Sequence, residues 1–447
     1  TSLTRLLAGV AELEARRFPR PAARTVEEAP ALAGLPQELR GILQKPPRER
    51  DNGALEKLAA HWRESDPAYA RQLDEVRQVR EQRSALNRAI PRVMVMEDQP
   101  KARDTFLLTR GLYHQPGAKV PAALPASLAG PASPAPRDRL DLARWLLQPT
   151  HPLAARVTVN RLWQSLFGVG LVKTAEDFGV QGERPVHPEL LDWLATELIE
   201  SGWDLKHLVR RIVTSATYRQ SSQVSPALAE LDPENRLPAR GARYRMPSWM
   251  IRDAALSAAG LLADRIGGPP VKPYQPAGVW EEATFGGKRY QADTGESLYR
   301  RSLYVFWRRI VGPTLFFDVA SRQTCTVKTP RTNVPLHALL TLNDVTYVEA
   351  ARWLAGQAWR EGADDPARLT ALYRRVLGRE PSGAERSVLS PALARHRAHF
   401  AGDRAEAGAL LRVGESRDAA GPSPDELAAW TLVAATVLNL DEALTRE

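Results

Sequence analysis

The sequence predicts a mainly α-helical protein, a multi-helical body with a small β component, on three observations. Apolar residues recur at helical spacing in most segments, for example over residues 190–199. Many such segments begin at a residue that starts or caps a helix, as Pro188 and Ser382 do. Segments with the alternating, β-branched and aromatic pattern of strands are few and short, and residues 105–110 and 302–307 are the clearest.

The first part of the chain indicates helices followed by short strands. A polar helix is expected over residues 54–88, and Pro67 should divide it into two. Residues 92–96 and 105–110 are predicted as short strands, followed by a turn and an edge strand. The Pro-, Ala- and Ser-rich run 121–136 suits neither a helix nor a central strand. We therefore expect an N-terminal connecting region over 1–120, a linker over 121–136 and a helical domain over 137–447.

Local signals mark the helix boundaries beyond the linker. Pro188 should start a helix that Gly202 ends, and Asp204 should cap the next helix, whose buried face includes Leu205. A helix beginning at Ser248 is expected to end at glycines 267 and 268. Capping boxes, in which a serine and a glutamate satisfy free backbone N–H groups reciprocally, are expected at two helix starts, Ser382 with Glu385 and Ser423 with Glu426.

The tryptophans fall on the apolar stripes of the expected helices and strands. Core packing is therefore expected for them rather than stacking against a sugar. The set comprises Trp145, Trp163, Trp193, Trp203, Trp249, Trp280 and Trp307.

Composition limits the function classes. With 43% hydrophobic and 25% charged residues among 447, the chain is typical of a globular protein, and no apolar run approaches the roughly 20 residues that span a bilayer. The single cysteine, Cys325, excludes an internal disulfide, a four-thiolate zinc site and an iron–sulfur cluster, and a C-x-x-C-H haem motif is absent. The eight histidines are dispersed, so neither a metal site nor a cofactor is expected in this chain. No signal peptide is visible, and the start at Thr1 indicates a fragment or a processed chain.

The formal charge of +9 raises the question of a polyanionic partner. Basic residues are spread over the chain and alternate with Glu and Asp, which disfavours nucleic-acid binding. Residues 206–252 are denser, with nine basic residues against three acidic ones. This run could dock an acidic partner or a sulfated or carboxylated glycan, or its arginines could pair internally.

A polar cluster surrounds the segment R-T-N-V-P-L-H-A-L-L-T-L-N-D-V-T-Y-V-E-A-A-R over residues 331–352. Arginine offers a planar fork for a carboxylate, and asparagine offers both a donor and an acceptor. These groups either satisfy buried backbone where helices meet or line a cleft that binds a ligand, and both explanations stay open. The candidate binding residues are Asn160, Arg161, Asp318, Arg322, Arg331, Thr332, Asn333, Asn343 and Asp344.

Four residues are candidates for catalysis, to be tested by mutation. His187 could form an acid/base pair with Asp177 or Asp192, although a His before Pro at a helix start more often serves as an N-terminal cap. Arg331 and Asp344 come from the polar cluster. The set is Asp177, His187, Arg331 and Asp344.

Blocks in a fixed order resemble a known family. The 331–352 segment resembles the signature R-T-N-x-P-L-Q-A-L-x-L-L-N-D-P-x-F-V-E-A-A-R, with His337 in place of Gln and Val345 in place of Pro. R-L-D-L-A-R-W from residue 139, V-N-R-L-W-Q from 159, H-P-E-L-L-D-W-L-A from 187 and the terminal L-N-L-D-E-A-L-T-R-E are similar to further family blocks. The family is the planctomycete-type PSD domain of unknown function, domain of unknown function fifteen-fifty-three.

The resemblance implies an architecture and a compartment. Its members are typically exported bacterial proteins in which this domain follows a cytochrome c module, so haem is expected only on an upstream module or a partner. We therefore expect an extracytoplasmic interaction or scaffold domain that docks a protein partner, the cytochrome c module or an extracellular polysaccharide. An enzyme acting on polysaccharide or coupled to the haem module is the alternative, and a binder of anionic glycan or nucleic acid is a second one.

Overall fold

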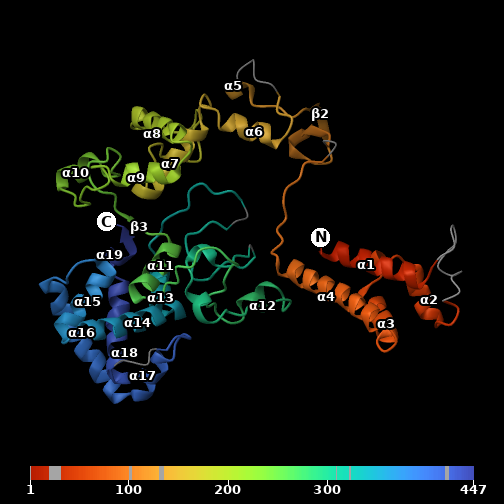
Figure 1. The fold of residues 1–447 in the computed structure, drawn as a ribbon. Coiled ribbons are helices and arrows are strands. Elements are labelled where there is room, and N and C mark those ends of the chain that lie inside the picture. Colours follow the sequence, from red (N-terminus) through yellow and green to blue (C-terminus); the bar gives the residue numbers. More distant parts are fainter. Residues whose placement is uncertain are drawn as a thin grey trace. The chain divides into compact units, whose positions relative to one another are not determined.

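The computed structural model describes residues 2–19, 32–99, 103–129, 135–308, 310–321, 324–417 and 422–446. Helices dominate these residues, and the strands form two small two-stranded sheets (Figure 1). The predicted fold class, mainly α with a small β component, is confirmed. The chain divides into two compact units, Thr1–Lys119 and Val120–Glu447.

The first unit is built from helices that pack around one apolar core. These are α1 (Ser2–Arg17), α2 (Gln37–Gln44), the short 3₁₀ helix η3 (Pro47–Glu49), α3 (Asn52–Trp62) and α4 (Pro67–Ala89). As predicted, a break at Pro67 separates α3 from α4, and the Asp66 side chain caps α4 by accepting from the backbone N of Tyr69 at 3.1 Å. Leu58 and Leu73 lie at the centre of the core.

A buried ion pair crosses this core. Arg50 donates to both carboxylate oxygens of Glu14, and the Tyr69 hydroxyl donates to the same carboxylate at 2.6 Å. Glu14 and Arg50 are almost completely buried, so each charge depends on the other for solvation. α1 is thereby connected to the turn before α3.

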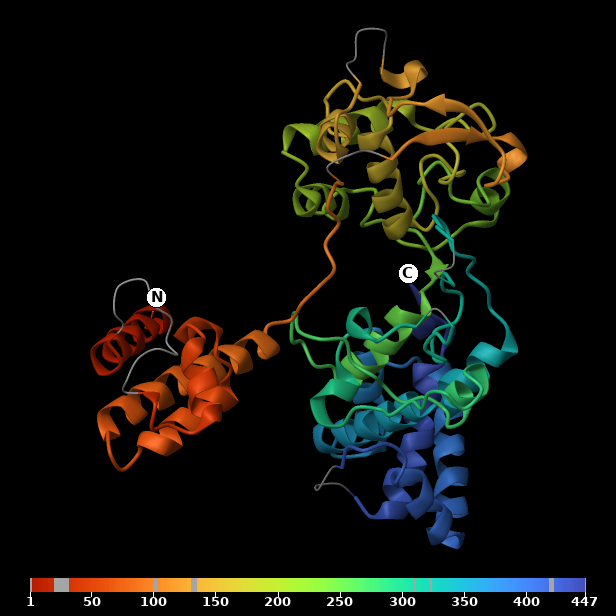
Figure 2. The ribbon, with the colours of Figure 1, turned by 90° about the vertical axis from the view of Figure 1, so that its right-hand side faces the viewer.

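A β-hairpin follows, and part of the strand prediction is wrong. β1 (Thr105–Leu108) pairs with β2 (Pro116–Val120) across the turn η4 (Thr109–Gly111), and the two strands lie side by side in Figure 2. Residues 92–96 are not a strand, because no neighbouring strand pairs with them. The run 121–136 is not free of helix either, since α5 (Ala126–Ala129) forms after Pro125, whose fixed φ suits a helix start.

The second unit contains a smaller and a larger apolar core. α6 (Arg139–Leu146), α7 (Ala154–Phe167), α8 (Pro188–Glu200), α9 (Leu205–Val213) and α10 (Pro226–Leu231) come first. Leu198 and Leu208 are fully buried in the smaller core between α7, α8 and α9. Asp204 caps α9 as predicted, but Leu205 is exposed because the first residue of the helix points away from that core.

The larger core surrounds α14 and α18. It is formed after β3 (Tyr244–Arg245) by the following elements: α11 (Ser248–Ala259), α12 (Val279–Ala283), η5 (Gly295–Tyr299), η6 (Ser302–Tyr304), α13 (Pro335–Asn343), α14 (Val345–Glu361), α15 (Asp365–Leu377), α16 (Gly383–Gly402), α17 (Arg404–Leu411), α18 (Pro424–Leu438) and α19 (Asp441–Leu444). Alanines on α14 and α18 are fully buried, and such small side chains let the two helices approach closely. β4 (Thr445–Arg446) then pairs antiparallel with β3.

Several local predictions for this unit are corrected. Residues 302–307 form η6 and one isolated bridge between Val305 and Val271, because no long strand lies beside them. Gly260, with φ of 76°, ends α11 earlier than glycines 267 and 268. The capping box of Ser382 is confirmed, whereas the Ser423 side chain does not bond to the backbone of α18.

Two tryptophans predicted for the core lie at the surface. Trp193 is 48% and Trp249 44% exposed. The guanidinium of Arg211 lies 5.6 Å from the Trp193 ring, which shields one part of it. Trp145, Trp163 and Trp280 are buried as expected.

Candidate functional site

Two recesses in the second unit meet at Arg331. The first has a volume of about 560 Å³ and the second about 350 Å³, and Gly168, Val169 and Arg331 line both. The first lies between the end of α7, the β3–α11 corner and residues 317–331, and the second between the end of α7 and residues 222–244. We refer to the two recesses together as the Arg331 groove.

The Arg331 side chain is held between aromatic and backbone groups. Its guanidinium lies 4.2 Å from the centroid of the Tyr244 ring, and the Tyr244 hydroxyl donates to the carbonyl of Ser165 at 2.6 Å. Gly168 has a φ of 81°, and a Cβ there would come within 2.9 Å of the Tyr244 ring and 3.2 Å of the Arg331 Nη1. The close approach of this backbone to Arg331 therefore requires glycine.

Arg331 stays cationic at the junction of the recesses. Partial burial lowers the pKa of its guanidinium, and the neighbouring Tyr244 opposes that shift, but an arginine starts far above neutral pH. Within the described part of the chain, no carboxylate forms an ion pair with it. An anion in the groove would meet a positive charge that is already positioned.

The residues after Arg331 are fixed by a turn on the opposite wall. Asp318, in the left-handed region with φ of 54°, accepts from the backbone N of Thr332 at 2.6 Å and from its hydroxyl at 2.9 Å. Asn333 accepts from the Arg245 Nη1 at 2.9 Å, and the Arg245 guanidinium lies 6.0 Å from the Phe317 ring. The carboxylate of Asp318 is thus occupied by Thr332, which leaves the lining of the first recess positive.

Cations outnumber carboxylates along this recess. Besides Arg331 and Arg245, its wall includes the exposed side chains of Arg161 and Lys328. Trp249, Met246 and Phe317 supply apolar surface beside them. Such a surface suits a ligand that combines negative charge with flat, weakly polar faces.

The structure therefore brings together part of the predicted site. Arg161, Asp318 and Arg331 line the first recess, and Thr332 and Asn333 bond to its walls. Arg322 lies outside the described residues.

The asparagines Asn160 and Asn343 have structural contacts instead. The fully buried Asn160 pairs with the backbone of Val172, donating to its carbonyl at 3.0 Å and accepting from its N–H at 2.8 Å. Asn343 makes one bond, to the carbonyl of Leu339, at the end of α13.

Asp344 separates two helices rather than interrupting one. It caps α14 by accepting from the backbone N of Thr346 at 2.9 Å. Burial raises the pKa of its carboxyl group, against the opposing hydrogen bonds from Thr346.

The other two candidates for catalysis also lie on loops or helix ends. Asp177 accepts from the backbone N of Gly179 at 2.6 Å in the loop after α7. His187 occupies the N-cap position of α8, but its side chain makes no capping hydrogen bond. Neither these residues nor Asp344 line the Arg331 groove.

The basic run 206–252 divides between internal pairs and the groove. Arg211 and Arg236 pair with Glu197 and Glu183 at 3.6 and 3.5 Å. Arg252 is fully buried and donates to the carbonyls of Leu298 and Arg300. The groove takes Arg240, Arg243 and Arg245. Both explanations of the run thus hold, for different residues.

The described residues hold no group of three or more His, Cys, Asp and Glu side chains placed to bind a metal ion. Nor does any helix among them combine the length and apolar character needed to cross a bilayer.

A mainly α-helical domain whose signature segment lines an arginine-rich groove is the class that fold and site define. The model of the PSD1 family, described as a protein of unknown function (DUF1553), matches residues 138–393. The chain belongs to this family, as the resemblance of its sequence blocks predicts. No curated protein and no solved structure matches the chain.

Proposed function

We propose that the domain is a non-catalytic, extracytoplasmic binding domain, and that the Arg331 groove takes an acidic polysaccharide. The observation that carries this proposal is the continuity of the two recesses at Arg331. A carboxylated or sulfated sugar would place its anionic group against the Arg331 guanidinium.

The lining of the groove supports an anionic ligand. Arginines occur in both recesses, Arg161 and Arg245 in the first and Arg240 and Arg243 in the second. A cleft lined by charges of one sign raises the local concentration of ions of the opposite sign. The guanidinium fork adds directional bonds to carboxylate or sulfate oxygens.

The shape of the groove supports a polymer. Two recesses that continue into each other can take successive units of a chain, with an anionic unit at their junction. Trp249, 44% exposed at the first recess, offers a face on which a sugar ring can stack.

The wider architecture belongs to the same proposal. As a planctomycete-type, cytochrome c-associated protein, the domain would hold an attached or partner haem module close to an extracellular polymer. The family resemblance supports this part, and a protein partner would bind outside the groove.

Titration with defined polysaccharides tests the proposal. Isothermal titration calorimetry with heparin, polygalacturonate and neutral dextran should give binding of one or both acidic polymers and none of dextran. Affinity should fall as salt rises, because screening shortens the reach of the groove charges. Arg331→Ala should weaken binding by about tenfold or more, as expected for the loss of one charge-assisted contact.

Two further variants separate the groove from general charge. Arg210→Ala removes the same charge from an exposed residue of α9 that does not line the groove, and it should bind as the unmodified protein does. Arg331→Lys keeps the charge and should bind with intermediate affinity, because the planar fork is lost. Equal loss in Arg210→Ala and Arg331→Ala, with both proteins folded, would contradict a specific role for the groove.

A further inference from the structure

An apolar segment after α4 lies uncovered by the rest of the first unit. Val93, Met94, Val95 and Met96 are 80%, 102%, 80% and 82% exposed. The chain leaves α4 as an extended trace over this stretch (Figure 1). Four consecutive large apolar side chains in water are unfavourable, since each loses the stabilisation that burial would give.

The backbone of the same segment is also unpaired. Among the described residues, none forms a backbone hydrogen bond with residues 92–96. The sequence V-M-V-M nevertheless favours a strand, because two of its side chains are β-branched and both faces are apolar. An exposed strand with free N–H and C=O groups is a template for pairing with another strand.

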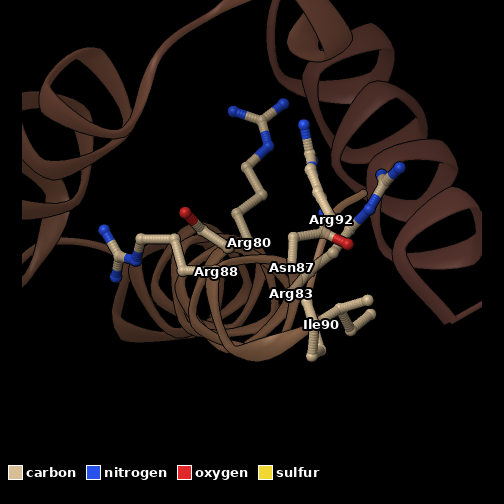
Figure 3. Close-up of a pocket in the computed structure, with 8 residues that line it drawn as sticks. Arg80, Arg83, Asn87, Arg88, Ile90 and Arg92 are labelled. Carbon is tan, nitrogen blue, oxygen red and sulfur yellow. The ribbon is translucent and has the colours of Figure 1, made fainter. Parts of the chain in front are cut away.

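The charges around the segment differ at its two ends. Arg83, Arg88 and Arg92 line an open hollow of about 800 Å³ at the end of α4, and no carboxylate of the described chain forms an ion pair with them (Figure 3). Arg80, beside them, is held by the carbonyls of Pro47, Arg48 and Arg50. At the other end the apolar run is followed by Glu97.

This charge pattern is complementary to itself in one direction only. When two copies of residues 92–97 run antiparallel, Arg92 of each can stand opposite Glu97 of the other, with Val93 opposite Met96 and Met94 opposite Val95. A parallel pair would place Arg92 beside Arg92. The antiparallel pair has the self-complementary form of a two-fold dimer.

We propose that residues 92–97 are a pairing strand that joins two copies of this chain, antiparallel, about a two-fold axis. The pairing supplies hydrogen bonds to the free backbone groups and covers part of the valine and methionine side chains. A lipid bilayer fits less well, because the unpaired N–H and C=O groups would remain unsatisfied in hydrocarbon. The dimer should be weak, with a dissociation constant on the order of tens of micromolar, because a two-stranded pair of this length buries little surface.

Charge reversal in the full chain tests the proposal. Analytical ultracentrifugation across micromolar to millimolar protein should show a concentration-dependent dimer. Arg92→Glu and Glu97→Arg should each weaken it by about tenfold, since like charges then face each other twice per dimer. The double variant should recover the affinity of the unmodified chain. Hydrogen exchange should show protection of the amides of residues 93–96 that grows with protein concentration.

A control and a second probe give the contrary outcomes. Arg83→Glu makes the same charge change on α4, outside the paired residues, and should leave the dimer intact. A chain that stays monomeric throughout, or a double variant that fails to recover, overturns the strand pairing. Binding of the monomer to phosphatidylserine vesicles with protection of the same amides would assign the segment to lipid instead, and would also overturn it.

Discussion

Asn160 offers the sharpest test of whether a signature residue serves structure or binding. Its side chain is fully buried and bonds to both backbone groups of Val172, which is itself buried. In Asn160→Ala neither the N–H nor the C=O of Val172 gains a substitute partner. Each orphaned group costs about 1–3 kcal/mol, so the variant should lose about 2–6 kcal/mol of unfolding free energy.

The expected loss can be converted into a melting temperature. For a unit of this size the unfolding entropy gives a shift of roughly 1.5 °C per kcal/mol, so Asn160→Ala should melt about 3–9 °C lower. Circular dichroism at 222 nm measures the midpoint. Asn343→Ala is the matched control, because Asn343 is exposed and makes one bond within its own helix, so its midpoint should move by less than about 1 °C.

Binding by the folded variants completes this test. Asn160→Ala, measured well below its melting temperature, should bind acidic polysaccharide as the unmodified protein does, since Asn160 does not line the groove. If the two asparagine variants melt together, the pairing with Val172 contributes little stability, and the structural assignment of Asn160 is refuted.

Two further predictions concern the larger core. Gly414→Ala should destabilise the protein by about 3 kcal/mol or more, because a Cβ would come within 2.3 Å of the buried Glu349 carboxylate carbon; Gly378→Ala shares the positive φ but has open space, and should lose only about 1–2 kcal/mol in urea unfolding. Arg379 lowers the pKa of Glu385 to about 2, so the stability that this pair adds, about 1 kcal/mol at its partly exposed position, is present above pH 4.5 and lost as pH falls towards 2. Glu385→Gln should therefore be less stable at pH 7 and flatten the pH dependence of unfolding over that interval, and an unchanged profile would refute the assignment.

Features set by neighbouring residues were predictable from the sequence. Asp204 caps α9 and the serine and glutamate of the capping box start α16, because side chain and backbone lie within one turn of each other. The fold class follows from the same periodic signals. The helix end at Gly168 was predicted for a similar reason, since glycine allows the φ of 81° found there.

Features set by distant residues were not predictable. Residues 302–307 have strand-forming side chains but only one bridge, because strand formation depends on a partner elsewhere in the chain. The site shows the same limit. Arg331 was singled out, but its stacking on Tyr244 and the contribution of Arg245 depend on contacts across almost ninety residues of sequence, as the Arg245–Asn333 bond shows.

The short sheet formed by β3 and β4 sets the order in which the groove can assemble on the ribosome. Arg446 donates to the carbonyl of Leu166, 280 residues earlier, and lies 4.3 Å from the Tyr218 ring. The wall of the second recess therefore lacks this brace until residue 446 has left the exit tunnel. Nascent chains should acquire affinity for the acidic polymer only at the last stage of translation, after most of their helices have formed.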